Sequence, residues 1–242
     1  MWTSNRRLRA AHPTRVTRAQ QLGLAIAVLT CVGLAGCAPA ETPPSSTAET
    51  DEIAPMRNGD LEAGTYLVNG FTVPFQVTVP DGWLMKDGWL LIKEPVNDQA
   101  VFLNFLNPYY VPTDACAWAG AITDVGATVE GFADAVAAQG TTTTTAPTDI
   151  TVGDYPGVEF DLTVDDGVDI TDCGEEHICI HSEVGYECTR YYQAVTRSET
   201  YRVLDLHGER AVLSVGQDAG VPASLIEEAR AVFDSIEFAS GG

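Results

Sequence analysis

The chain has 242 residues, of which 45% are hydrophobic, and its 34 acidic and 13 basic side chains give a formal net charge of −21. This length is enough for one domain with a full core. So acidic a chain repels the phosphates of nucleic acids and of anionic lipids, and we therefore expect no nucleic-acid partner.

The first 36 residues have the three-part pattern of a secretory signal peptide. Five arginines and no acidic residue precede an apolar run from Leu22 to Leu34, which is shorter than the roughly 20 residues of a membrane-spanning helix. The run ends in a Leu-Ala-Gly-Cys sequence at Cys37, which resembles the lipobox of bacterial lipoproteins. The resemblance implies that Cys37 is lipidated and becomes the mature N-terminus. An uncleaved membrane anchor, and twin-arginine export through Arg6 and Arg7, stay open as alternatives.

Residues 37–60 are expected to form a disordered tether between the lipid and the folded part. The segment is rich in Pro, Ser, Thr, Ala and acidic residues and has almost no core-forming side chains, which is typical of a linker. Two or more acyl chains anchor a protein stably, at about 0.8 kcal/mol for each buried CH₂. We therefore expect residues 61–242 to be one globular domain, held by a lipid anchor at the outer face of the cell membrane. Without the leader, this chain keeps 8 basic and 34 acidic side chains, a net charge of −26.

The first half of the domain is predicted to be mostly β-structure, followed by one helix. Runs of β-branched and aromatic residues, bounded by Gly, Pro, Asn or Asp, predict strands at 65–68, 71–79, 89–93 and 101–106. Apolar residues at helical spacing predict an amphipathic helix from Val129 to Gln139, with Thr128 as its N-cap and Gly140 at its end.

The second half is predicted to contain strands on both sides of an irregular acidic insert at 165–190, followed by a second helix. Strands are predicted at 149–152, 158–164, 191–195, 200–206 and 211–215. A second helix is predicted from Pro222 to Ile236, in which Ser224 and Glu227 have the spacing of a capping box. Because the strands outnumber the helices and come in neighbouring runs, we predict an α+β fold: an antiparallel β-sheet covered by two helices.

The predicted domain contains an even number of cysteines, which in an exported protein indicates disulfides. They are Cys116, Cys173, Cys179 and Cys188. Four cysteines allow three pairings. We favour Cys179 with Cys188, which closes a short hairpin-like loop, and Cys116 with Cys173, which attaches the insert to the rest of the domain.

Two short sequences resemble PsbP-like domains. A Val-Pro-Asp-Gly-Trp sequence at 79–83 is similar to the Pro-x-Gly-Trp sequence of that family, and a late helix ends in Asp-Ser-Ile-Glu-Phe at 234–238. Such domains occur in actinobacterial envelope lipoproteins, a setting that the Ala- and Asp-rich, Lys-poor composition fits. The cysteine-bearing insert departs from the family pattern. The resemblance implies a fold and a setting and not an activity.

Two stretches contain residues that bind metals in other proteins. On a strand, His177 and His181 would face the same side as Cys179, and imidazole and thiolate bind transition metals. A disulfide removes the thiolate, so we expect exposed histidines beside a disulfide and no metal site. Six acidic side chains between Asp165 and Glu176 provide oxygens for calcium, but their spacing matches no EF-hand loop. We expect a solvated acidic loop without a tight calcium site, and no cofactor.

Adjacent tyrosines on a strand cannot both point inward, which predicts a binding surface at two tyrosine pairs. These candidates are Tyr109, Tyr110, Tyr191 and Tyr192. The sequence contains no Gly-x-Ser-x-Gly, His-Glu-x-x-His or phosphate-binding glycine-rich motif. We therefore expect a non-enzymatic binding or scaffold module with an unknown envelope ligand or protein partner. The alternative is a small envelope hydrolase or metal-dependent enzyme centred on His177, His181 and nearby acidic residues.

Overall fold

The computed structural model describes residues 53–96 and 99–239. Cys37 and most of the predicted tether therefore lie outside the described residues. Within the described ranges, no helix is both long enough and apolar enough to cross a membrane.

The centre of the domain is a nine-stranded sheet whose paired strands run antiparallel. In spatial order its strands are β10 (Thr142–Thr144), β12 (Tyr155–Val164), β15 (Ser198–Asp205), β16 (Arg210–Gln217), β7 (Gln99–Leu106), β6 (Leu90–Val96), β5 (Trp83–Lys86) and β2 (Gly59–Leu61), while β11 (Thr148–Val152) also pairs with β12. Every residue of β16 except Gln217 is buried. Such burial on both faces explains why apolar residues follow one another at 211–213 and do not alternate with polar ones.

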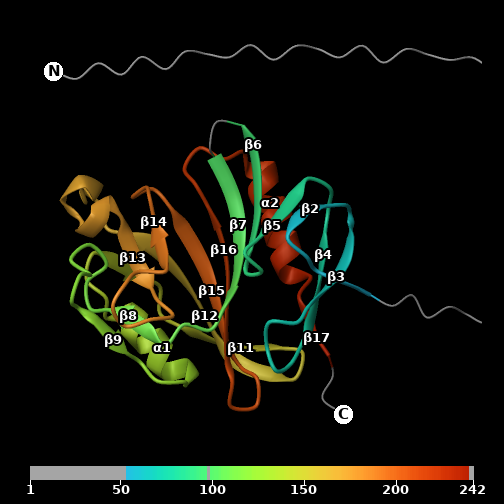
Figure 1. Ribbon diagram of the computed structural model, residues 1–242, viewed down its shortest axis with the longest axis horizontal. Coiled ribbons are helices and arrows are strands. Elements are labelled where there is room, and N and C mark those ends of the chain that lie inside the picture. The colour runs from blue at the N-terminus through green and yellow to red at the C-terminus, as the bar shows by residue number, and fades with distance from the viewer. Residues whose placement is uncertain (1–52, 97–98, 240–242) are drawn as a thin grey trace, which may run out of the picture. The chain divides into compact units, whose positions relative to one another are not determined.

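The two faces of this sheet pack against different elements (Figure 1). Leu213 and Val215 of β16 join the apolar cluster that contains α2 (Ala223–Asp234), whereas Val212 joins the cluster that contains α1 (Val129–Ala137). Successive side chains of a strand point to opposite faces. The sheet therefore separates two cores.

A smaller four-stranded sheet packs together with α2 on the first face (Figure 1). Its strands are, in spatial order, β1 (Ala54–Pro55), β3 (Gly64–Val68), β4 (Phe75–Val79) and β17 (Glu237–Phe238). The ring centroid of Phe75 on β4 lies 5.2 Å from those of Phe105 on β7 and Phe238 on β17. These aromatic contacts join the two sheets into one core.

The second face carries α1 and two short antiparallel strand pairs (Figure 1). The pairs are β8 (Tyr110–Pro112) with β9 (Ile122–Asp124), and β13 (Ile178–His181) with β14 (Arg190–Tyr192). Single 3₁₀ turns at Ile170–Asp172 and Gly174–Glu176 precede β13. The predicted irregular insert at 165–190 thus contains regular structure that its acidic sequence does not indicate.

The predicted α+β class is confirmed in its main part, an antiparallel sheet with two helices. The prediction that the helices cover the sheet is only partly right, because α1 has 9 residues and α2 has 12. The smaller sheet and the short strand pairs also cover its faces, since two such short helices cannot shield nine strands.

The folded part begins earlier than predicted. Ala54 and Pro55 pair with β3, Gly59 to Leu61 pair with β5, and Met56 packs against the core. The predicted end of the tether at residue 60 is therefore too late. A strand of two or three residues is too short to show alternation in its sequence, so its polar surroundings make it look like linker.

The helix ends depend on local sequence. The Thr128 hydroxyl accepts a hydrogen bond from Gly131 N–H at 3.0 Å, which confirms it as the N-cap of α1. In α2 the N-cap is Pro222, without a side-chain hydrogen bond, so the predicted capping box of Ser224 and Glu227 is wrong. Ser224 already lies inside the helix, where its hydroxyl cannot cap the first turn.

Gly157 provides a test of the tight pairing between β12 and β15. A Cβ at this position would lie 2.1 Å from Val203 O and 2.9 Å from Leu204 Cα. We expect Gly157→Ala to lower the free energy of unfolding by about 1–3 kcal/mol, as overpacking does, measured by urea denaturation. Gly70→Ala is the control, because nothing lies within 4 Å of its Cβ. Equal effects of the two substitutions would contradict the described pairing.

Candidate functional site

One part of the second face carries both disulfides, and we call it the cystine lobe; it comprises residues 108–125 and 165–192. Backbone hydrogen bonds join its two segments. Tyr110 N–H donates to Ser182 O at 3.1 Å, Ser182 N–H donates to Tyr110 O at 2.8 Å, and Cys179 N–H donates to Ala115 O at 2.8 Å. Two segments that are distant in sequence thus form one unit on the sheet.

The disulfides pair Cys116 with Cys173 and Cys179 with Cys188, which confirms the favoured pairing. The first links the two segments of the cystine lobe across a separation of 57 residues, and the second closes a loop across 9. Each bond is expected to add about 2–4 kcal/mol of stability. The disulfides also indicate an oxidising, extracytoplasmic compartment.

The Asp114 carboxylate fixes the chain beside the first disulfide. Its Oδ1 accepts hydrogen bonds from the N–H groups of Cys116 and Ala117 at 2.8 and 2.7 Å and from the Thr141 hydroxyl at 2.9 Å. Partial burial raises the pKa of this carboxyl, but the three hydrogen bonds outweigh burial and lower its pKa from the ordinary 3.8. The group is therefore a charged anchor for Cys116 at neutral pH.

The four tyrosines predicted as a binding surface do not behave alike. Tyr109 and Tyr191 are 42% and 38% exposed, and Tyr110 is half-buried. Tyr192 is fully buried, so its place in the predicted surface is wrong. Neighbouring residues of β14 point to opposite faces: Tyr191 faces solvent, and Tyr192 joins the apolar cluster beneath the cystine lobe.

Sequence reasoning does not single out Tyr186, although this side chain is 81% exposed. The exposed large apolar side chains of the described residues are Tyr109, Tyr186 and Tyr191, and all three belong to the cystine lobe. The position of Tyr186 in the sequence is the one signal that indicates its exposure. Tyr186 follows a glycine inside the short loop that the second disulfide closes, and side chains at such positions are commonly exposed.

The loop that carries Tyr186 is held by its own hydrogen bonds. The Ser182 hydroxyl donates to Glu187 O at 2.7 Å, and Glu183 N–H donates to the Thr189 hydroxyl oxygen at 3.0 Å. The first bond crosses the loop inside the second disulfide, and the second joins the loop to Thr189, just after Cys188. The exposed ring is therefore presented on an ordered backbone.

The His-x-Cys-x-His stretch does not converge on one point. The His177 ring lies between those of Trp118 and Tyr191, with centroids 5.1 and 4.3 Å away, whereas His181 is only 2% exposed. The expectation of two exposed histidines facing the side of Cys179 is thus wrong for His181. All of β13 is buried, Cys179 included, so His181 at its end lies in the core while His177, just before the strand, is only half-buried. Across residues 53–96 and 99–239, no three His, Cys, Asp or Glu side chains are grouped to hold a metal ion.

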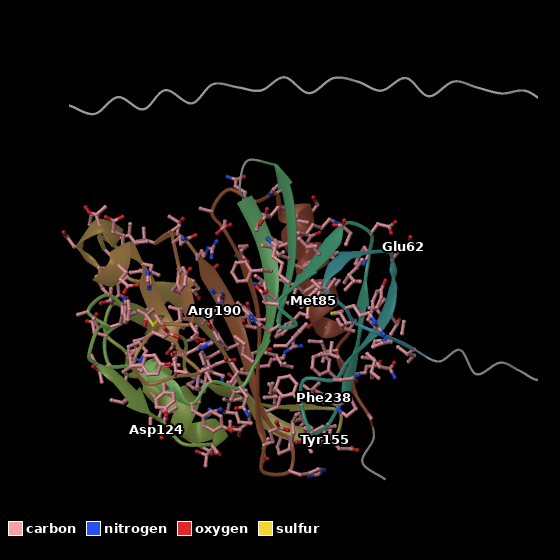
Figure 2. The ribbon with its side chains drawn as sticks, viewed as in Figure 1. Glu62, Met85, Asp124, Tyr155, Arg190 and Phe238 are labelled. Carbon is pink, nitrogen blue, oxygen red and sulfur yellow. A yellow bond between two sulfur atoms is a disulfide. The ribbon has the colours of Figure 1, made fainter. Side chains whose placement is uncertain are left out.

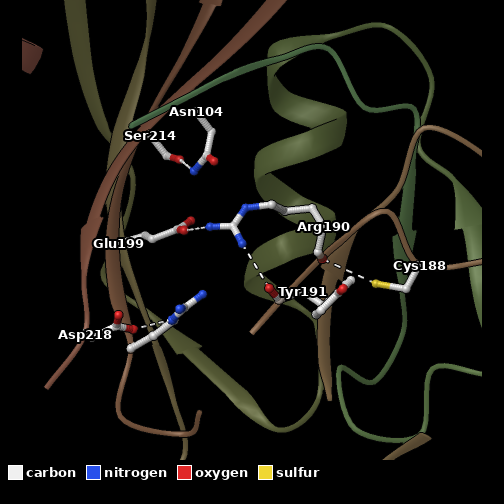
Figure 3. Close-up of polar contacts among 8 residues, drawn as sticks. Asn104, Cys188, Arg190, Tyr191, Glu199, Ser214 and Asp218 are labelled. Atoms are coloured by element: carbon white, nitrogen blue, oxygen red, sulfur yellow. Dashed lines mark hydrogen bonds and ion pairs between the residues drawn. The ribbon is translucent and has the colours of Figure 1, made fainter. Parts of the chain in front are cut away.

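A buried ion pair joins the cystine lobe to the central sheet (Figure 3). Arg190 Nη2 on β14 donates to Glu199 Oε1 on β15, and the two side chains are 7% and 0% exposed. Arg190 Nη1 also donates to the backbone oxygen of Tyr191 at 3.0 Å. Because each charge lacks water, removing either partner is expected to cost about 3–5 kcal/mol.

The groups around this ion pair have fixed protonation states. Burial raises the pKa of the Tyr192 and Tyr201 hydroxyls well above 10, and the charge of Glu199 raises it further. Burial also lowers the pKa of His181 well below 6.5, and two nearby arginines lower it further. At neutral pH this region therefore holds one ion pair, two protonated phenols and one neutral imidazole.

A cleft of about 510 Å³ lies beside the start of α1, within the size range of small-molecule sites. Its charged lining consists of Glu130, Asp149, Asp205 and Arg210. The Arg210 guanidinium already donates to three backbone carbonyl oxygens. The free charges of the cleft are therefore mainly negative, which disfavours anionic molecules. No motif in the sequence indicates this cleft.

No protein-family model and no curated protein matches the chain. The resemblances to a lipobox and to PsbP-like domains therefore stay predictions. Function has to be argued from the geometry of the cystine lobe and its neighbours.

The buried imidazole of His181 predicts acid-sensitive stability. Its pKa is near 6.5 in the unfolded chain and lower in the fold, so below pH 6.5 the unfolded state binds more protons. For each unit by which the pH is lowered below 6.5, the free energy of unfolding of the parent should then fall by up to about 1.4 kcal/mol relative to that of His181→Gln. Urea denaturation between pH 7 and pH 5 measures this difference.

His207→Asn is the control for this measurement, because His207 is exposed and asparagine tolerates its positive φ of 61°. The control should keep the pH dependence of the parent. The same pH dependence in His181→Gln and the parent would show that His181 is not buried as described.

Proposed function

We propose that this protein is a lipid-anchored binding module of the bacterial envelope, and that it acts by docking a protein partner on the cystine lobe. The disulfides support an extracytoplasmic setting. The signal-peptide pattern and the Leu-Ala-Gly-Cys sequence support an anchor at Cys37 on the outer face of the cell membrane.

The observation that carries the docking role is the distribution of exposed aromatic rings. The exposed large apolar side chains among the described residues are three tyrosines of the cystine lobe, led by Tyr186 at 81%. Tyrosine is enriched among residues that dominate binding energy. An ordered loop loses little conformational entropy when a partner binds, which increases the net affinity.

The alternative of a hydrolase or metal-dependent enzyme would need its histidines close together and free to exchange protons. His177 lies between two aromatic rings, and His181 lies in the core with a pKa well below 6.5. Cys179 is engaged in a disulfide. The placement of these residues supports a structural role for the stretch and favours binding over catalysis.

The anchor is tested by Cys37→Ala in the full chain. Without the lipidated sulfur, we expect the protein to leave the membrane fraction or to accumulate unprocessed, because no acyl chain then anchors it. Cell fractionation and the mass of the mature N-terminus measure both effects. A processed variant that stays with the membrane as the parent does would refute the anchor.

Docking is tested by a photo-reactive diazirine amino acid in place of Val184, which lies two residues from Tyr186 in the same loop. In cells that make the full chain, illumination should give a discrete crosslinked adduct. Tyr186→Ala should lower its yield at least five-fold, since truncating such a residue costs about 1 kcal/mol or more.

The matched control places the diazirine at Glu62, an exposed position at the opposite end of the domain from Asp124 of the cystine lobe (Figure 2). It should give no such adduct. Docking on the cystine lobe would be wrong if the Val184 position gave no adduct, or if Tyr186→Ala left the yield unchanged.

A further inference from the structure

We infer that the surface docked on the cystine lobe is basic: a Lys- or Arg-bearing protein segment that lies over the ring of Tyr186 between the carboxylates of Glu183 and Glu187. This inference rests on the proposed docking function and adds the chemistry of the partner. It is carried by the ordered tyrosine and by the charges around it.

The charges of the cystine lobe are almost all negative. Its two segments contain ten acidic residues and one basic residue, Arg190. That arginine is buried and paired with Glu199, which lies outside the cystine lobe. The exposed surface of the cystine lobe therefore has eight exposed acidic side chains and no exposed lysine or arginine.

The rest of the described domain is different, because several of its carboxylates have a basic neighbour. Lys93 pairs with Glu228 at 2.6 Å, and Arg202 pairs with Glu159 and Asp234 at 2.8 and 2.7 Å. In the described part of the chain, no carboxylate of the cystine lobe takes part in an ion pair. The carboxylates of the cystine lobe therefore have no counter-charge within its own surface.

Tyr186 shares its loop with two of these acidic residues. Glu183 and Glu187 are exposed in the same loop, on the two sides of Tyr186 along the chain. Gly185 lies against the ring of Tyr110, so that a Cβ there would be 3.1 Å from a ring atom. The half-buried Tyr110 thus supports the turn from below, and the Tyr186 ring projects from it into solvent.

A cationic side chain suits this arrangement for two reasons. A guanidinium or ammonium over an exposed tyrosine ring is attracted by the π-system, which corresponds to about a two- to five-fold gain in affinity. The flanking carboxylates attract it further, and the uniform negative field of the surface increases the encounter rate with basic partners. A partner that was only apolar would have to dehydrate the carboxylates without compensation.

The test uses the full chain in uncharged detergent and a fluorescent hexa-arginine peptide as the probe, followed by fluorescence anisotropy at low and at physiological salt. We expect binding that weakens with salt. Tyr186→Ala should weaken it about two- to five-fold, and the double substitution Glu183→Gln, Glu187→Gln should weaken it at least five-fold. Tyr186→Phe should retain binding, because it keeps the ring.

The control is Asp166→Asn with Asp172→Asn, which removes two charges from exposed positions elsewhere in the cystine lobe. This variant should change the affinity less than two-fold, and hexa-glutamate should not bind. An equal loss of affinity in the two double variants would overturn the inference, because the peptide would then be attracted by the total charge of the protein and not by the carboxylates beside Tyr186. Absence of hexa-arginine binding would also overturn it.

These results are separable from the docking function. A Tyr186-dependent adduct at the Val184 position, together with no effect of the Glu183 and Glu187 substitutions, would refute the basic partner and leave docking intact. Loss of the adduct itself would refute docking.

Discussion

The buried ion pair between Arg190 and Glu199 is the constraint on which the arrangement of the cystine lobe depends. Two charges withdrawn from water are costly unless they stay paired, so the pair disfavours positions of β14 that would separate Arg190 from Glu199. The same strand carries Tyr191 and Tyr192, and its alternation sends the first to solvent and the second into the core. The position of the exposed Tyr191 ring thus depends on an ion pair that is itself buried.

The two faces of the central sheet achieve their stability by different means. On the first face, α2 and the smaller sheet bury a large cluster of aliphatic and aromatic side chains. On the second, a separate apolar cluster lies beneath α1 and the cystine lobe, and two disulfides, backbone hydrogen bonds to Ala115 and Ser182, and the ion pair add to the cohesion of the lobe. Small units that bury little surface commonly need such crosslinks. These crosslinks hold the loops of the cystine lobe in place while Tyr109, Tyr186 and Tyr191 remain exposed.

Local patterns in the sequence predict the local features of this fold and fail where position depends on distant segments. Alternation and helical spacing predict the main strands and both helices, and Thr128 is recognisable as a cap because its partner is three residues away. Which member of a tyrosine pair faces solvent depends on register, and a shift by one residue inverts the answer; the error at Tyr192 has this origin. The burial of His181 similarly depends on the distant segments that pack on both faces of β13. The prominence of Tyr186 depends on a loop whose shape a disulfide and side-chain hydrogen bonds determine.

The disulfide between Cys116 and Cys173 encloses a stretch of chain that contains α1, β10, β11 and β12. An endoprotease that cuts the backbone once anywhere inside this covalent ring leaves the two fragments joined through sulfur. The same holds for a cut beside Tyr186, because Cys179 and Cys188 keep both ends of the opened loop together. Proteolytic release of either enclosed segment therefore requires a reductant or a second cut. The exposed loop can accordingly be nicked without being shed from the domain.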